Sequence, residues 1–162
     1  MNALYDASKA GVKIELIVRG ICCIKAGVPG LSDNISVRSI VGNYLEHSRI
    51  FYFYNDGFED IYMGSADWMP RNLDKRVEIT FPVEDPELKK KIKNILKIQL
   101  EDTLKAHIMQ PDGSYAKQDL RGKAKLDSQM YFVKLAQESQ KPVKEEDNDR
   151  VFIPVESHGD NE

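Results

Sequence analysis

The run Val12-Lys13-Ile14-Glu15-Leu16-Ile17-Val18, which leads into Arg19-Gly20, is the earliest part of the chain that indicates a fold class. Its mostly β-branched apolar residues are typical of a strand. Residues 4–10 before it have the pattern of a helix that Gly11 ends. A helix followed at once by a strand predicts an α/β domain. Because the chain opens inside this helix without an N-cap residue, we expect it to be a piece of a longer protein.

A loop rich in glycine is expected over residues 19–34, with a helix after it. Ser32-Asp33-Asn34 offers N-cap residues, and apolar residues follow at helical spacing: Val37, Ile40, Val41, Tyr44 and Leu45. This predicted helix ends near Glu46-His47. A β-hairpin is predicted next, with strands at 50–54 and 60–63 and a turn at 55–57. His47 is therefore expected where a helix gives way to a strand.

The second half of the chain contains the clearest predicted helix. A polar turn through residues 68–72 and a strand at 76–83 come first. Asp85 is a suitable N-cap and Pro86 suits the first helical position. The predicted core-facing stripe of this helix consists of Leu88, Ile92, Ile95, Leu96, Leu100 and Leu104. A short hairpin around 111–113 and a helix from Asp127 to about Gln137 follow.

Composition limits the domain organisation to one domain and a tail. The chain has 162 residues, of which 41% are hydrophobic, and a net charge of −3. Residues 140–162 are acidic and poor in apolar side chains, so we expect a domain at 1–139 and a mobile tail at 140–162. Alternatively, residues 151–155 dock as a short strand. The sequence has no run of 18 apolar residues and no secretion signal, and we expect a cytoplasmic protein whose Cys22 and Cys23 are reduced packing residues.

Basic residues stand at places where α/β sheets bind ligands. Arg19 lies at a strand end before a glycine-bearing loop, and His47 and Arg49 lie before the next strand. Three more follow the tight turn: Arg71, Lys75 and Arg76. Arginine grips phosphate through two parallel hydrogen bonds, so these residues favour a phosphorylated ligand. The alternative is that each arginine is a solvated surface group and the histidine is structural.

Four blocks of sequence, in this order, carry a resemblance to a known family. They are Ile17-Val18-Arg19-Gly20-Ile21-Cys22, Pro29-Gly30-Leu31-Ser32-Asp33-Asn34-Ile35, Tyr44-Leu45-Glu46-His47-Ser48-Arg49 and Ser65-Ala66-Asp67-Trp68-Met69-Pro70-Arg71-Asn72-Leu73-Asp74-Lys75-Arg76. From about Leu4 to Gln137 the chain resembles the C-terminal region of bacterial polyphosphate kinases. The resemblance implies a phospholipase D-like α/β domain, with a mixed central sheet flanked by helices. It also implies that this chain is the second of two halves that share one site.

The resemblance implies reversible transfer of the terminal phosphate of ATP to inorganic polyphosphate, through a phosphohistidine outside this chain. Arg19 and His47 would bind ATP phosphates, His47 would assist catalysis, and Arg49, Arg71 and Arg76 are further phosphate-binding candidates. The expected cofactor is Mg²⁺, with ligands outside this chain. Expected partners are ATP, ADP, polyphosphate and the N-terminal domains of the same enzyme, which we expect to be a homo-oligomer and membrane-associated when complete. Binding of nucleic acid is not expected, and the chain alone is expected to be inactive.

The sequence departs from the family pattern at a few positions. The superfamily motif His-x-Lys-x4-Asp would need a lysine at Arg49 and an aspartate at Tyr54, and Asn43 stands where we expect many relatives to carry arginine. Two alternatives therefore stay open, a phospholipase D-type phosphodiesterase and a non-catalytic module that binds nucleotide or phosphate. A P-loop or protein-kinase mechanism is unsupported, because neither motif is present.

Overall fold

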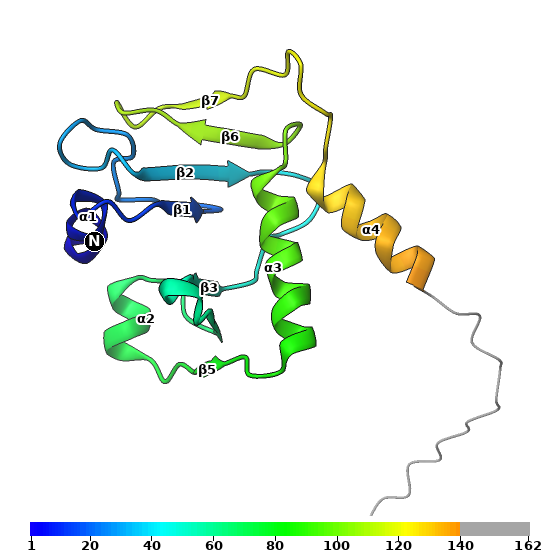
Figure 1. The fold of residues 1–162 in the computed structure, drawn as a ribbon, viewed down its shortest axis with the longest axis horizontal. Helices are drawn as coiled ribbons and strands as arrows, with labels where there is room; N and C mark the ends of the chain where they lie inside the picture. Colours follow the sequence, from blue (N-terminus) through cyan, green and yellow to red (C-terminus); the bar gives the residue numbers. More distant parts are fainter. Residues whose placement is uncertain (140–162) are drawn as a thin grey trace, which may run out of the picture.

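The computed structural model describes residues 1–139 (Figure 1). In chain order its elements are α1 (Asn2–Lys9), β1 (Ile14–Ile17), β2 (Ile35–Ile40), β3 (Ile50–Phe53), the 3-10 turn η1 (Asn55–Gly57), β4 (Asp60–Gly64), α2 (Pro70–Lys75), β5 (Thr80–Pro82), α3 (Pro86–Leu100), β6 (Ala106–Met109), β7 (Tyr115–Lys117) and α4 (Ser128–Ser139). The predicted acidic tail, and the alternative strand at 151–155, lie outside the described residues.

The strands form two sheets. One is a four-stranded sheet in the order β1-β2-β6-β7, and the other is a three-stranded sheet in the order β3-β4-β5. β1 and β2 pair in parallel and the remaining pairs are antiparallel, so the first sheet is mixed and the second is antiparallel. The α/β class is confirmed. The expectation of one central sheet is corrected, because a second sheet stands beside the mixed one (Figure 1).

The predicted helix between Val37 and Leu45 is wrong. Residues 35–40 form β2, whose Ile35 aligns with Ile14 of β1 in the parallel register. Ile35, Val37 and Ile40 are buried in β2, and β-branched residues such as these favour a strand. Residues 41–49 belong to no helix or strand, so His47 lies in an irregular connection between the two sheets.

The region between β4 and α3 also differs from the expectation. The predicted strand at 76–83 is reduced to β5, since only residues 80–82 pair with β4. The predicted polar turn contains a short helix, α2, with Pro70 in its first turn. Proline is compatible with this position because its missing N–H would have no partner inside the helix.

Several local predictions are confirmed. The hairpin of β3 and β4 closes through Asn55-Asp56-Gly57, and β6 and β7 form a second hairpin. The side chain of Asp85 accepts a hydrogen bond from the backbone N–H of Leu88 (2.9 Å) and caps α3. Asp127 likewise accepts from the N–H of Met130 (3.1 Å) at the start of α4.

No helix within residues 1–139 is long and apolar enough to cross a bilayer.

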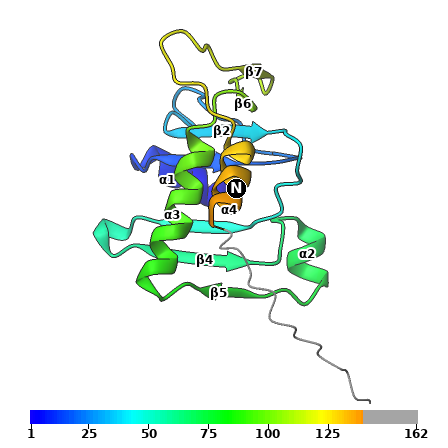
Figure 2. The same cartoon turned by 90° about the vertical axis from the view of Figure 1, so that its right-hand side faces the viewer.

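Each sheet has its own hydrophobic cluster. The cluster of the four-stranded sheet contains Ile24, Ala26, Ile35, Val37 and Met109. The cluster of the three-stranded sheet joins Ile61 and Val83 to Ile92 of α3. The predicted stripe on α3 is therefore correct at Ile92, but Leu88 is 50% exposed. Figures 1 and 2 show α3 running from the level of β5 to the level of β2, so this helix lies alongside both sheets.

A buried carboxylate fixes the end of α3. Asp102 is 0% exposed and its Oδ1 accepts from the N–H groups of Lys105 (2.7 Å) and Ala106 (3.1 Å). Its Oδ2 accepts from both the N–H and the hydroxyl of Ser128, each at 2.7 Å. Asp102 therefore joins the end of α3 to the first residue of β6 and the first residue of α4.

We expect Asp102→Ala to lower the free energy of unfolding by about 3 kcal/mol or more, because buried donors lose their acceptor. Asp102→Asn should cost less, since the amide keeps one acceptor oxygen. Asp112→Ala is the control, because Asp112 bonds only Ser114 in an exposed turn. Denaturant titrations followed by circular dichroism measure these losses, and equal losses for the two alanine variants would contradict the role of Asp102.

Candidate functional site

Glu46 holds the irregular connection between β2 and β3 in place. Its carboxylate accepts hydrogen bonds from Nε2 of Gln99 in α3 (3.0 Å) and Nε2 of Gln129 in α4 (2.7 Å). Its backbone carbonyl accepts from Nη1 of Arg19 (2.8 Å). Three distant segments therefore converge on the residue next to His47, and they position a stretch that has no hydrogen-bond ladder of its own.

Gln129 makes a second set of contacts with the same connection. Its Oε1 accepts from the N–H of Tyr44 (2.9 Å), and its Nε2 donates to the carbonyl of Tyr44 (2.7 Å). A Cβ atom at Gly42 would collide with the end of the Gln129 side chain, so a larger residue there would displace Gln129 from its contacts with Tyr44. The packing of α4 thus determines the path of the connection before His47.

Asp67 brings two of the predicted arginines together. Nη2 of Arg19 lies 3.2 Å from Oδ2 of Asp67, and Nε of Arg49 lies 3.1 Å from Oδ1. Nη1 of Arg49 also donates to the carbonyl of His47 (3.1 Å). Arg19, His47 and Arg49 therefore form one cluster with Asp67 at its centre.

The cluster keeps a positive charge. The hydrogen bond from Arg49 is the main cause that holds the pKa of Asp67 below its usual value, and the charges of Arg49 and Arg19 act in the same direction. Two guanidinium groups then face one carboxylate. The side chains of Arg19 and Arg49 are 30% and 19% exposed, and the contacts of Arg19 use only part of its five N–H donors. The arrangement can accept a further anion such as a phosphate group.

His47 presents its ring to solvent. The residue is exposed, and its side chain has no hydrogen bond within residues 1–139. His47 does not cap a helix, because no helix ends near it. The imidazole is therefore free to interact with a ligand held by the two arginines.

The remaining basic candidates lie on or beside α2. Arg71 and Lys75 are exposed, and within residues 1–139 neither makes a side-chain hydrogen bond or ion pair. Nε of Arg76 lies 3.7 Å from Oε1 of Glu78, and its Nη1 lies 3.5 Å from Oδ1 of the buried Asn72. Asn72 in turn donates to the carbonyl of Asp67 (3.1 Å). Arg76 is thus connected to the cluster through Asn72, and no contact brings Arg71 to it.

Arg19, His47 and Arg49 were expected from the sequence, but the polar residues that hold them in place were not. Asp67 stands inside one of the four resembling blocks, yet nothing local shows that its carboxylate meets arginines at 19 and 49. Gln99 did offer a signal, because an amide interrupts the apolar side of α3 and is buried. A polar residue at such a position needs a partner, and here the partner is Glu46.

Comparisons with known proteins agree with the four blocks. Residues 1–129 match the family described as "Polyphosphate kinase C-terminal domain 2". The chain is 56% identical over 135 residues to a polyphosphate kinase 1 of Chlorobaculum tepidum, which covers 83% of this chain and 19% of that protein. It is 52% identical over 141 residues to a polyphosphate kinase of Lactiplantibacillus plantarum, with 87% and 20% covered.

A solved structure is also similar. The crystal structure of polyphosphate kinase from Porphyromonas gingivalis matches with a TM-score of 0.78 and 43% identity, and covers 85% of this chain and 22% of that one. The chain thus spans about a fifth of the length of the relatives it matches.

The ion pairs of Asp67 predict a pH-dependent stability. The folded-state pKa of Asp67 is lowered, so its contribution is present above its unfolded pKa of about 3.9 and is lost as the pH falls through the folded pKa. We expect Asp67→Asn to destabilise the chain at about pH 6 and to have much less effect near about pH 2.5. Urea titrations of both proteins at both pH values provide the measurement. A difference in stability that stays the same at both pH values would rule out the ion pairs as its source.

Proposed function

Because the chain belongs to the polyphosphate kinase family, as its C-terminal domain 2, we propose that it supplies one phosphate-binding half of a phosphotransferase. The complete enzyme reversibly transfers the terminal phosphate of ATP to inorganic polyphosphate. The observation that carries the proposal is the cluster in which Asp67 holds Arg19 and Arg49 beside the exposed His47. We also propose that the domain is phospholipase D-like and forms the second half of a shared site.

Electrostatics is the first contribution of the cluster. Phosphoryl transfer depends mainly on the positioning of the phosphates and on stabilisation of their negative charge. Asp67 orients Arg19 and Arg49 and leaves one net positive charge, and the planar guanidinium groups match the geometry of phosphate oxygens. We therefore assign these arginines to the phosphates of ATP.

His47 is proposed as the catalytic residue of this half. A histidine can donate a proton or a hydrogen bond to a leaving oxygen near neutral pH. The residue is exposed, and Arg49 of the arginine pair donates to its backbone carbonyl. In the proposed reaction the terminal phosphate moves from ATP to a nitrogen of the histidine outside this chain, and ADP departs. The phosphate then moves from that nitrogen to the terminal oxygen of polyphosphate.

The other groups of the reaction belong to the rest of the enzyme. Within residues 1–139 no three His, Cys, Asp or Glu side chains lie close enough together to hold a metal ion, and both oxygens of Asp67 are occupied by arginines. We therefore propose that the ligands of Mg²⁺ lie outside this chain. The N-terminal domains of the same enzyme and a homo-oligomer are proposed partners. A cytoplasmic location, with membrane association of the complete enzyme, stays a prediction.

Radiolabelled ATP separates this proposal from its two alternatives. The complete enzyme should place the terminal label in a long polymer. A phospholipase D-type phosphodiesterase would instead release a phosphodiester cleavage product, and a binding module would bind ATP without turnover. Either of the last two results would overturn the assignment to phosphoryl transfer.

We predict that His47→Ala in the complete enzyme lowers kcat by about 10² to 10⁴ and changes the KM for ATP much less. His47→Gln should recover part of the rate if hydrogen bonding is sufficient, and almost none if a proton must be delivered. Steady-state kinetics per folded molecule, together with melting temperatures, test this. Retention of most turnover by a less stable His47→Ala variant would show that the role is structural.

We predict that Arg19→Ala in the complete enzyme lowers kcat/KM for ATP. The corresponding loss of transition-state stabilisation should be about 1.5–3 kcal/mol, the value of a hydrogen bond to a charged group. Arg19→Lys should rescue this only in part, because lysine keeps the charge but loses the planar fork. Asp67→Asn is the matched control, since it breaks the ion pair and leaves Arg19 in place. If Asp67→Asn reproduced the whole defect of Arg19→Ala, Arg19 would be a positioning residue only.

A further inference from the structure

The outer side of α3 carries a row of lysines. At 100° of rotation per residue, Lys89, Lys93, Lys97 and Lys90 lie within an arc of about 100°, and we call these four residues the lysine ridge. The buried or half-buried residues Ile92, Ile95, Leu96, Ile98 and Gln99 occupy the remaining arc, from about 180° to about 340° when Lys89 is set at 0°. Lys91 is exposed but lies about 100° beyond Lys90 around the helix, outside the ridge. The ridge is about 12 Å long from Lys89 to Lys97.

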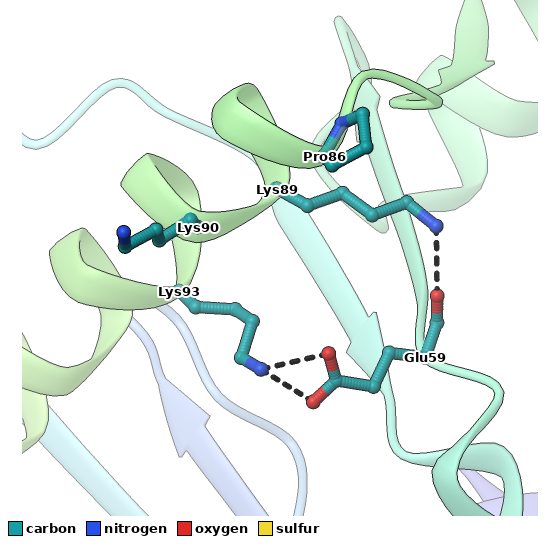
Figure 3. A pocket seen from close by; sticks show the side chains of 5 residues that line it. All are labelled: Glu59, Pro86, Lys89, Lys90 and Lys93. Atoms are coloured by element: carbon teal, nitrogen blue, oxygen red, sulfur yellow. Dashed lines mark hydrogen bonds and ion pairs between the residues drawn. The ribbon is translucent and has the colours of Figure 1, made fainter.

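A hollow of about 230 Å³ adjoins the ridge, lined by Lys89, Lys90 and Lys93 together with Glu59 and Pro86 (Figure 3). Nζ of Lys93 contacts both carboxylate oxygens of Glu59, with 2.7 Å to Oε2. Nζ of Lys89 donates to the backbone carbonyl of Glu59 (3.0 Å). Two lysines thus already bind oxygen atoms in this hollow, and a phosphate oxygen could replace those of Glu59.

The charge of the ridge is only partly neutralised. Lys93 has Glu59 as its counterion, and Lys97 lies 3.9 Å from the exposed Glu101. The carbonyl that accepts from Lys89 is uncharged, and Lys90 has no ion pair or side-chain hydrogen bond within residues 1–139. The hydrogen bond from Lys93 lowers the pKa of Glu59, as expected for a carboxylate in a positive environment.

We propose that the lysine ridge binds the polyphosphate chain along α3, as an accessory site outside the cluster of Arg19 and His47. This inference rests on the proposed function for its ligand. Lysines are flexible point charges without the planar fork of arginine, which suits a flexible polymer with a charge on every unit. Repeated charges along a helix also favour a long polyanion over a single nucleotide, because each contact releases a counterion.

The position of α3 connects the ridge to the candidate site. Gln99, near the C-terminal end of α3, donates to Glu46, which precedes His47. Lys89 lies ten residues earlier, or about 15 Å along the helix axis. A polymer held on the ridge therefore lies on the same rigid element that positions the connection carrying His47, so binding there raises the local concentration of phosphate groups near the site.

The test measures binding of inorganic polyphosphate of about 100 phosphates to the 162-residue chain, by calorimetry at several salt concentrations. Lys90→Ala should weaken binding by about threefold to tenfold, on the scale found for one lysine at an anionic surface. Lys91→Ala is the matched control, because it removes a neighbouring exposed lysine off the ridge, and it should change binding by less than about twofold. Glu59→Gln should strengthen polyphosphate binding by about the same factor by which Lys90→Ala weakens it, since Glu59→Gln removes the carboxylate that competes for Lys93.

Circular dichroism of each variant confirms that the fold is retained. Equal losses for Lys90→Ala and Lys91→Ala would show unspecific attraction and overturn the ridge, as would absence of polyphosphate binding. Single-stranded RNA of similar charge should bind more weakly, and tighter RNA binding with the same loss in Lys90→Ala would reassign the ridge to nucleic acid. ATP kinetics of Arg19→Ala in the complete enzyme test the proposed function separately, because Arg19 is not part of the ridge.

Discussion

The position of the candidate site depends on the carboxylate of Asp67, which holds two arginines that adjoin strands of different sheets. Arg19 follows β1 of the four-stranded sheet, while Arg49 precedes β3 of the three-stranded sheet and Asp67 follows β4. The sheets have separate ladders and separate buried clusters, so no strand pairing aligns one with the other here. The paired contacts of Asp67 supply that alignment, and Glu46 adds contacts from Arg19, α3 and α4. Side-chain contacts therefore hold most of the irregular connection that carries His47.

Arg19 and Arg49 hold the two sheets together through Asp67, and in the proposed function they also bind phosphate. A lone arginine at a surface loses side-chain entropy when it binds phosphate. Asp67 and the carbonyls of Glu46 and His47 already restrict these guanidinium groups, so less freedom remains to be lost when an anion arrives. The carboxylate also reduces the local positive charge. In the proposed function, the cluster therefore orients a phosphate rather than only attracting it, as phosphoryl transfer requires.

Local chemistry predicted the elements whose signals lie within a few residues of each other. The hairpin of β3 and β4 follows from Asn55-Asp56-Gly57, and the start of α3 from Asp85-Pro86. The sequence of β2 predicts a helix because Val37 and Ile40 are three residues apart, as on one face of a helix. The same residues are compatible with a strand whose first and last residues are buried. Its parallel pairing with β1 decides between the two, and that partner is brought to it by the long loop at 19–34. A distant contact of this kind leaves no trace in local periodicity.

The same difference separates the parts of the site that could be predicted from those that could not. Arg19, His47 and Arg49 were identified because basic residues at element ends have a local meaning, whereas Asp67 acquires its role only from partners 18 and 48 positions away. α3 contains both residues whose burial follows from the helical repeat and a residue, Gln99, whose role depends on a distant partner. Its helical repeat predicts the buried position of Ile92, whereas Gln99 interrupts the apolar side and donates to Glu46. A buried polar residue that breaks an otherwise regular pattern therefore indicates which side of an element faces the site.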